Sequence, residues 1–436
     1  MLPATRIMPS AIRPARTEPV TFRRLFAKLG PGLITGASDD DPSGIGTYSQ
    51  IGAQFGYGML WTMLFSYPLM AIIQEISARI GRVTGFGIAG NIRRHYPRPI
   101  LYSVVSLMLL ANIFNLGADV GAMGAALQLL VPGPLWLYVL LFGGSSLALQ
   151  VFIPYTKYVR YLKWLTLTLF AYVATAFVVH VSWPEAIRHT LVPSFSFKAG
   201  FLTALVAALG TTISPYLFFW QASQEVENVT TNSLEQPLKQ SPRQAPAQLG
   251  RIRVDTFIGM AISNVIALFI IVTTAATLHA HGVLNVDTSA QAAKALEPLA
   301  GRFAFVLFAL GIIGTGLLAI PVLAGSVAYA VSEAFKWQAS LEKRAEELPR
   351  FYWILTAATC LGLSLNFVGI DPIRALFWAA VINGVVAAPI MAVLMLMAGN
   401  RSVMGKFTIS TPLKVIGWSA TGAMLLTAIG VIATLR

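Results

Sequence analysis

The chain has 436 residues, of which 56% are hydrophobic and only 11% are charged. Soluble domains carry about 25% charged residues, so this composition excludes an ordinary soluble protein and indicates an all-α polytopic membrane protein. The net charge of +13 does not indicate a nucleic-acid partner, because the charges are distributed as the positive-inside rule expects. With a cytoplasmic N-terminus, only six of the 31 Lys and Arg residues fall in outer segments: Arg188, Lys198, Lys294, Arg302, Arg374 and Arg436.

The N-terminal segment is rich in Pro and Arg and has no apolar core, so we predict a disordered basic cytoplasmic tail over residues 1–28 instead of a cleavable signal peptide. Residues 29–436 are predicted to form a single transmembrane domain in a lipid bilayer, with the C-terminus outside a bacterial inner membrane. The eleven expected spans are 30–54, 57–78, 99–131, 133–154, 161–182, 199–224, 254–278, 303–333, 351–368, 372–398 and 412–434.

The segments between the spans contain no soluble domain. Residues 225–250 are rich in Gln, Pro, Asn and Ser and are predicted to be a cytosolic linker, and a short helix is expected around 290–299. No GxxxxGKS or GxxxxGKT signature occurs, so we do not expect transport driven by ATP hydrolysis. For a transporter we expect neither an enzymatic activity nor a cofactor. The single Cys360 excludes a disulfide framework.

The first span contains three adjacent carboxylates, Asp39, Asp40 and Asp41. A carboxylate at the bilayer centre costs roughly 2.5 to 3.5 kcal/mol, and the Pro42 that follows removes a helical amide donor. We therefore predict a helix that is broken at residues 41–44 and lines a polar cavity. The alternative is a loop between two short helices, which the flanks disfavour because each is too short to span a bilayer alone.

The sixth span is interrupted in a similar way, at residues 210–215. Five spans separate the two breaks, so the second set of five runs upside down relative to the first. Interrupted helices at corresponding places in two inverted halves point to the midplane binding site of a transporter. We predict two inverted five-helix repeats, 30–182 and 199–398, with helices 1 and 6 broken and an extra helix at 412–434.

The residues at the breaks predict a site for a hard cation. Asp41 is the expected principal ligand, whereas Asp39 and Asp40 are expected to face water in the entry path. The Thr211 carbonyl and the Ser214 hydroxyl face the gap if the second break lies at Ser214–Pro215; alternatively, the Ser214 hydroxyl bonds back within its own helix. Ligation by oxygen alone fits Mg²⁺, Mn²⁺ or Ca²⁺.

Other polar residues lie within the expected spans. Asp119 is a candidate second ligand, vestibule charge or proton site, with a structural pairing as the alternative. Asn112 and Asn115 are expected to form hydrogen bonds between helices. Asn383 is a candidate ligand from the tenth span, and Tyr216 is interpreted as packing or as a gate.

The stretch GPGLITGASDDDPSGIGTYSQIGAQFGYG resembles the first helix of the Nramp family of divalent-metal transporters, whose pattern is Asp-Pro-Gly-Asn after a Gly-Pro-Gly start. The second break at ISPY, the eleven spans and the basic N-terminus also resemble that family. The resemblance implies the inverted-repeat fold of the amino-acid transporter superfamily. The stretches DDPSG, ISPY and WQASQE are similar to a divergent, Nramp-related magnesium-transporter branch.

The resemblance also implies roles for individual residues. The metal-binding Asp of the family falls on Asp41, and its Asn falls on Gly44. The family's Ala and Met in the sixth helix fall on Thr211 and Ser214, and its His falls on Tyr216.

The acidic pair of the family's third helix falls on Asn115 and Ala118, with Asp119 one position along. Without the Met, the His and this acidic pair, the resemblance implies an oxygen-rich site and transport that is not coupled to protons.

These observations predict a divalent-cation transporter for Mg²⁺, Mn²⁺ or Fe²⁺ that works by alternating access. The transported ion is the substrate, and the predicted metal-site residues are Asp41, Gly44, Asp119, Thr211, Ser214 and Asn383. The alternative is a cation-coupled transporter of amino acids or other organic solutes with the same fold. The cluster Asp39–Asp41 disfavours this alternative because it would repel a carboxylate substrate.

Overall fold

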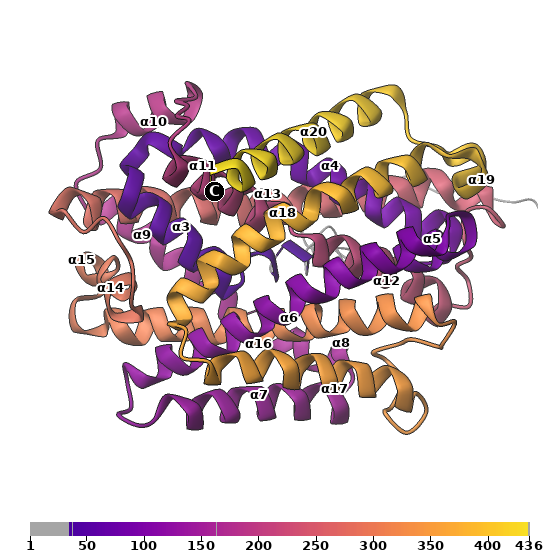
Figure 1. Ribbon diagram of the computed structural model, residues 1–436, viewed down its shortest axis with the longest axis horizontal. Helices are drawn as coiled ribbons and strands as arrows, with labels where there is room; N and C mark the ends of the chain where they lie inside the picture. The colour runs from indigo at the N-terminus through magenta and orange to yellow at the C-terminus, as the bar shows by residue number, and fades with distance from the viewer. Residues whose placement is uncertain (1–34, 37, 163, 435–436) are drawn as a thin grey trace, which may run out of the picture.

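The computed structural model describes residues 35–36, 38–162 and 164–434, and this part of the chain contains helices and no β-strand (Figure 1). The predicted tail at 1–28 lies outside the described residues. The long helices are α3 (Pro42–Phe55), α4 (Trp61–Thr84), α6 (Arg98–Gln128), α7 (Leu135–Phe152), α11 (Ala199–Thr212), α12 (Pro215–Thr231), α13 (Ala245–Thr277), α16 (Ala304–Ala334), α17 (Pro349–Ser364), α18 (Pro372–Gly399) and α20 (Thr411–Thr434). The nine-residue α9 (Phe170–Val178) belongs to the fifth expected span.

Shorter α-helices connect them or extend their ends: α5 (Ile88–His95), α8 (Tyr155–Leu162), α10 (Trp183–Leu191), α14 (Ser289–Lys294), α15 (Glu297–Ala300) and α19 (Arg401–Met404). The 3₁₀ turns are η1 (Gly56–Met59), η2 (Leu165–Leu169), η3 (Pro242–Gln244), η4 (His279–His281), η5 (Gly301–Phe303), η6 (Leu365–Phe367) and η7 (Gly405–Phe407). The predicted short helix around 290–299 is therefore present, as α14 and α15.

Seven helical segments of the described chain are long and apolar enough to cross a membrane, or eight with the pair formed by α3–η1 and α4, which is bent by 108°. Four of the eleven expected spans do not meet this criterion alone. The first is represented by the 14-residue α3 and the second by α4, which pass only as a pair, whereas the fifth corresponds to the short apolar helix Leu165–Val178 and the ninth to the 16-residue α17.

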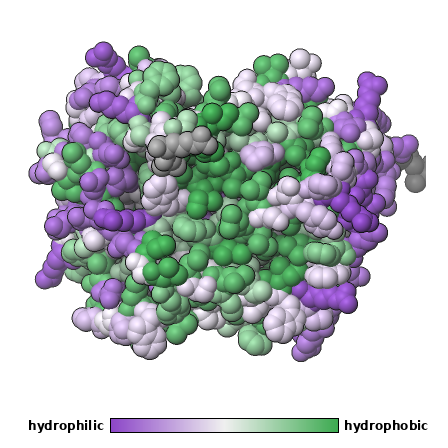
Figure 2. All heavy atoms as spheres, viewed as in Figure 1, coloured by the Kyte–Doolittle hydropathy of each residue, from purple (hydrophilic) through white to green (hydrophobic). Residues whose placement is uncertain are grey.

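The surface has the polarity of a membrane protein. Figure 2 shows a broad hydrophobic band across the middle of the molecule and hydrophilic residues gathered at its left and right edges. In the same view α5 and α19 lie at the right end, whereas α14 and α15 lie at the left end. We call the right-hand end, which carries α5 and α19, the α5 end.

Close helix crossings hold the centre of the bundle together, because glycines allow backbones to touch. A Cβ atom on Gly210 of α11 would lie 2.1 Å from the Ala380 carbonyl oxygen and 2.4 Å from the Gly384 nitrogen, both on α18. Similarly, a Cβ atom on Gly81 of α4 would lie 2.1 Å from the Ala222 carbonyl oxygen of α12. Both broken-helix halves of the second repeat are therefore fixed against uninterrupted helices.

The predicted linker is shorter and more ordered than the sequence indicates. Residues 225–231 continue α12 and residues 245–250 begin α13. Between them, the Leu238 amide donates to the Arg82 carbonyl at 3.1 Å, and Arg82 forms an ion pair with Glu235 at 2.5 Å. Composition misled the prediction because the apolar Leu238, which is fully buried, docks this polar segment onto the end of α4.

Candidate functional site

Both predicted breaks are present, and they are built in the same way. The first lies at Asp40–Asp41, and α3 then restarts with Pro42 in its first turn. The second lies at Ile213–Ser214, and α12 restarts with Pro215. Proline suits the first position of a helix, since its fixed φ is helical and its missing N–H has no partner there. The second break lies where we predicted it, and the first lies slightly earlier.

The Asp41 carboxylate is held by four donors. Its Oδ1 accepts from the Ser43 hydroxyl at 2.6 Å and from the Gly44 amide at 2.9 Å, so Asp41 caps the N-terminus of α3. Its Oδ2 accepts from Asn115 Nδ2 at 3.0 Å and from the Tyr216 hydroxyl at 3.2 Å. Donors that stabilise a carboxylate favour its charged form, and the positive end of α3 adds to this effect.

Asn115 of α6 connects Asp41 to the other polar groups of the site. Its Nδ2 also donates to Asp119 Oδ2 at 3.3 Å, and its Oδ1 accepts from Asn383 Nδ2 of α18 at 3.3 Å. The structure thus brings two predicted ligands, Asp119 and Asn383, to Asp41 through a residue that we expected only to join helices. Asn112, one turn away, behaves as predicted and donates to the Leu323 carbonyl and the Ser326 hydroxyl of α16.

Thr211, Ser214 and Gly44 lie at the second break or next to it. The Ser214 hydroxyl donates to the carbonyls of Gly210 and Thr211 at 2.9 and 2.8 Å, which is the back-bonding alternative. The Thr211 carbonyl therefore already accepts one hydrogen bond and retains one lone pair. A Cβ atom on Gly44 would lie 3.2 Å from Thr211 Cγ2, so the two broken helices come into contact here.

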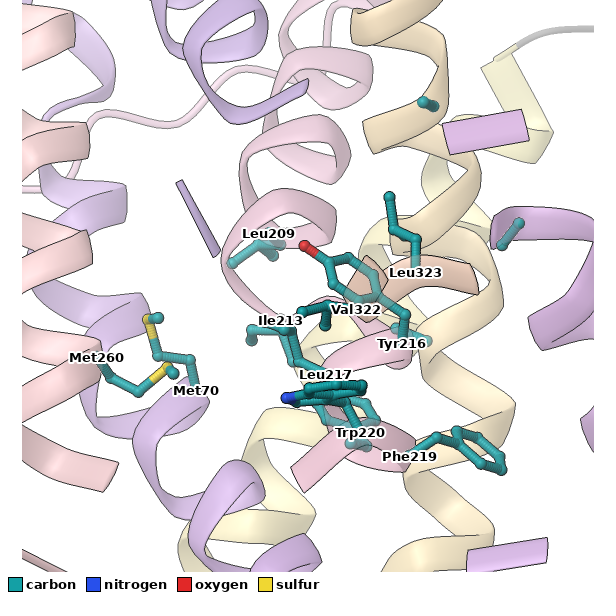
Figure 3. Close-up of a cluster of buried hydrophobic side chains, with 14 of the residues drawn as sticks. Met70, Leu209, Ile213, Tyr216, Leu217, Phe219, Trp220, Met260, Val322 and Leu323 are labelled. Carbon is teal, nitrogen blue, oxygen red and sulfur yellow. The ribbon is translucent and has the colours of Figure 1, made fainter. Parts of the chain in front are cut away.

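Tyr216 belongs to the site and is more than packing. Its ring is buried among apolar side chains of α11, α12 and α16, and its hydroxyl points away from Trp220 and Phe219 (Figure 3). That hydroxyl lies 3.2 Å from Asp41 Oδ2 and 3.1 Å from the Ser38 carbonyl oxygen. The sequence feature that indicates this contact with Asp41 is the position of Tyr216 directly after Pro215, which starts α12.

Asp39 and Asp40 do not face open water, which corrects our expectation. Both side chains are buried, and the Ser263 hydroxyl of α13 lies 2.7 Å from Asp39 Oδ2 and 3.0 Å from Asp40 Oδ1. The physical reason is that α13 packs against the first break and supplies this hydroxyl. Ser263 was not predictable from the sequence, because a lone serine in an apolar helix usually bonds to its own backbone.

The electrostatics of the site favour a cation. Among the described residues, no ion pair joins Asp41 or Asp119 to a basic side chain. Three buried oxygens around them have no hydrogen-bond partner in the described structure: Asp119 Oδ1, Asn383 Oδ1 and Thr211 Oγ1. Buried oxygens without partners are costly unless something binds them.

The same groups limit which cation fits. The described residues contain no group of three or more His, Cys, Asp or Glu side chains that could hold a metal ion on their own. The available ligands are carboxylate, amide, hydroxyl and carbonyl oxygens, which suit hard cations that retain some of their water.

Two broken helices that meet at a buried polar site inside an apolar bundle define a membrane transporter of the inverted-repeat class, and not an enzyme. The chain belongs to the Nramp family: residues 32–434 match the family described as natural resistance-associated macrophage protein-like. The chain is 29% identical over 419 residues to the divalent metal cation transporter MntH of Yersinia enterocolitica, covering 92% of this chain and 93% of that protein.

Solved structures support the same fold. The Eremococcus coleocola manganese transporter, in complex with an aromatic bis-isothiourea compound, superimposes on this chain with a TM-score of 0.73 at 18% sequence identity. The superposition covers 98% of this chain and 90% of the manganese transporter chain. MhsT in complex with L-phenylalanine superimposes with a TM-score of 0.63 at 13% identity, covering 93% and 98%. The predicted fold class, two inverted five-helix repeats with broken helices, is confirmed.

Proposed function

We propose that this chain transports divalent metal cations across the membrane by alternating access, with Asp41 as the principal ligand. The observation that carries the proposal is the buried set of oxygens around Asp41. Among the described residues, the carboxylates of Asp41 and Asp119 have no basic partner, and three oxygens, one of Asp119 and one each of Asn383 and Thr211, have no hydrogen bond. The names of two similar proteins, a divalent metal cation transporter and a manganese transporter, support this substrate class.

We further propose that the site accepts Mg²⁺ as well as Mn²⁺. The side chains bonded to Asp41 or to its partner Asn115 offer only oxygen and nitrogen atoms, from Ser43, Asp119, Tyr216 and Asn383. A site without sulfur has little means to prefer Mn²⁺ or Fe²⁺ over Mg²⁺. In this proposal Asp119 and Asn383 complete the site from α6 and α18, and the Thr211 carbonyl contributes from α11.

Transport is proposed to be independent of protons. Three histidines have hydrogen bonds in the described structure, and each is bonded to a backbone carbonyl and not to Asp41. His95 bonds to the Asn91 carbonyl, His279 to the Ala53 carbonyl and His281 to the Thr277 carbonyl. The α5 end is proposed to face the cytoplasm of a bacterial inner membrane, with the N-terminus on that side and the C-terminus outside. The excess of Lys and Arg on one side supports this orientation.

Uptake into proteoliposomes that contain a pH-sensitive dye tests both ion choice and coupling. We expect Mn²⁺ uptake to be inhibited by excess Mg²⁺ and the lumen to keep its pH, because the ligands are hard oxygens and no described histidine serves the site. Mn²⁺ uptake that is undiminished by Mg²⁺ would contradict the oxygen-only site. Acidification in step with metal uptake would contradict uncoupled transport.

Substitution of Asn115 tests the connection between Asp41 and its neighbours. We expect Asn115→Ala to weaken metal affinity by about 10- to 100-fold, as for residues that orient metal ligands, because Asp41 loses a donor and Asp119 is no longer positioned. The measurement is the concentration dependence of Mn²⁺ uptake. Asn112→Ala is the matched control, since Asn112 lies one turn away and, among the described residues, its side chain donates to α16. Equal effects of the two variants would show that only helix packing was disturbed.

A further inference from the structure

A large cavity is lined by residues of α5 and of the neighbouring ends of α6 and α16; α5 lies at the right-hand end of the molecule in Figure 1. The cavity has a volume of about 850 Å³ and is formed by α5, the beginning of α6 and the end of α16. Its lining includes four cationic and four aromatic side chains: Arg93, Arg94, Arg98, Lys336, Phe86, Tyr102, Phe335 and Trp337.

Glu333, the carboxylate among the described residues of the cavity wall, already accepts hydrogen bonds. Its two oxygens accept hydrogen bonds from the amides of Gly87 and Gly90, each at 2.9 Å. These amides belong to the N-terminal end of α5, where they have no partners within the helix. The Glu333 carboxylate is thus hydrogen-bonded to the backbone of α5. With four cationic side chains and one carboxylate in the described lining, the cavity has an excess of positive charge.

The four cations of the cavity have no carboxylate partner at ion-pair distance within the described chain. Arg93 is partly buried, and its Nε atom is enclosed without a hydrogen bond to the described residues. Burial and the neighbouring Arg94 lower the pKa of Arg93 below its usual range, and Glu333 offsets part of this effect. Positive groups that repel one another in a shared cavity favour an anionic ligand.

The aromatic residues at the cavity are of the types typical of a membrane interface. Tyr102 and Trp337 lie where α6 begins and α16 ends, and Tyr and Trp are enriched at this depth of membrane proteins. The Phe335 and Trp337 rings stack with centroids 5.2 Å apart, and Lys336 between them has φ +63°, a conformation that non-glycine residues avoid. At this turn the Lys336 side chain is exposed and contributes to the cavity lining.

We propose that this cavity binds the phosphate-bearing headgroup of an anionic phospholipid, with Arg93 and Arg98 as the main contacts. The position at the edge of the hydrophobic band selects a lipid over a soluble anion, because the acyl chains can remain beside α6 and α16 while the headgroup enters the cavity. Basic pockets between membrane helices are suited to such headgroups.

The test uses the full-length protein, purified in detergent and depleted of lipid. Binding of dioctanoyl phosphatidylglycerol is measured by native mass spectrometry and compared with dioctanoyl phosphatidylcholine and with inorganic phosphate. We expect the anionic lipid to bind about tenfold more tightly than the zwitterionic one and phosphate not to compete at equal concentration. Equal binding of both lipids would overturn the proposal, and effective competition by phosphate would replace the lipid with a free anion.

Two double variants locate the binding. We expect Arg93→Gln with Arg98→Gln to abolish the preference for phosphatidylglycerol. Arg401→Gln with Lys406→Gln removes two cations from the same end of the molecule, on α19 and η7 and outside the cavity lining, and is expected to keep the preference. Loss of preference in the control pair alone, or in both pairs, would overturn the assignment to this cavity. The comparison of lipids on the unmodified protein decides the proposal even if the first variant does not fold.

Discussion

Asp41→Asn is expected to abolish divalent-metal uptake into proteoliposomes while the protein still folds. Asparagine caps a helix as well as aspartate does, so the start of α3 should be retained. The variant loses the negative charge, and its amide group meets the donors of Asn115 and Tyr216, which bond to Asp41 Oδ2 in the structure. We expect uptake to fall by about 100-fold or more, since loss of an outer partner alone weakens a metal site by 10- to 100-fold.

Asp371→Asn is the matched control for this experiment. Asp371 also precedes a helix-starting proline, and its side chain caps α18 by accepting from the Ile373 amide at 2.9 Å. It lies at the exposed end of α18, whereas Asp41 is buried in the centre. We expect normal uptake from Asp371→Asn. Uptake by Asp41→Asn at the wild-type rate would remove Asp41 from the metal site.

Gly210→Val is expected to destabilise the folded protein strongly. Even one added carbon at this position would lie 2.1 Å from the Ala380 carbonyl oxygen, so α11 and α18 must separate. Overpacking of this kind costs about 1 to 3 kcal/mol, and more where backbones meet directly. We expect a lower melting temperature in detergent and little transport, because Asn383 lies beside Gly384 at the same crossing and would move with it.

Gly144→Val is the control for this substitution. Gly144 lies on α7, and nothing within 4 Å would meet an added Cβ atom. The variant should melt and transport like the wild type. If Gly210→Val were as stable as Gly144→Val, the crossing of α11 and α18 would be looser than the structure shows.

The fold was predictable from the sequence because some of its residues are incompatible with a continuous helix in lipid. Carboxylates and a proline in the middle of an apolar span exclude a continuous helix in lipid, and the second proline at an inverted position identifies the repeat. The prediction was less accurate where a helix continues beyond its apolar stretch. Residues 225–231 and 245–250 are polar but helical, since α12 and α13 extend past the hydrophobic band.

The candidate site was predictable in part. Asp41, Asp119 and Asn383 were identified because polar groups in apolar spans are rare, and the structure brings all three together. The roles of Asn115 and Tyr216 depend on contacts between helices far apart in the sequence, which no local pattern encodes. Asp39 and Asp40 likewise accept hydrogen bonds from Ser263, more than two hundred residues away.

The central claim is that a divalent cation binds at Asp41 between the two broken helices. The most direct measurement is an anomalous-scattering map from crystals of the protein soaked with Mn²⁺. We predict a peak about 2.0 to 2.6 Å from an Asp41 carboxylate oxygen, the range of metal–oxygen bonds for hard cations, and its loss in Asp41→Asn. A peak elsewhere in the bundle, or one that persists in Asp41→Asn, would contradict the account.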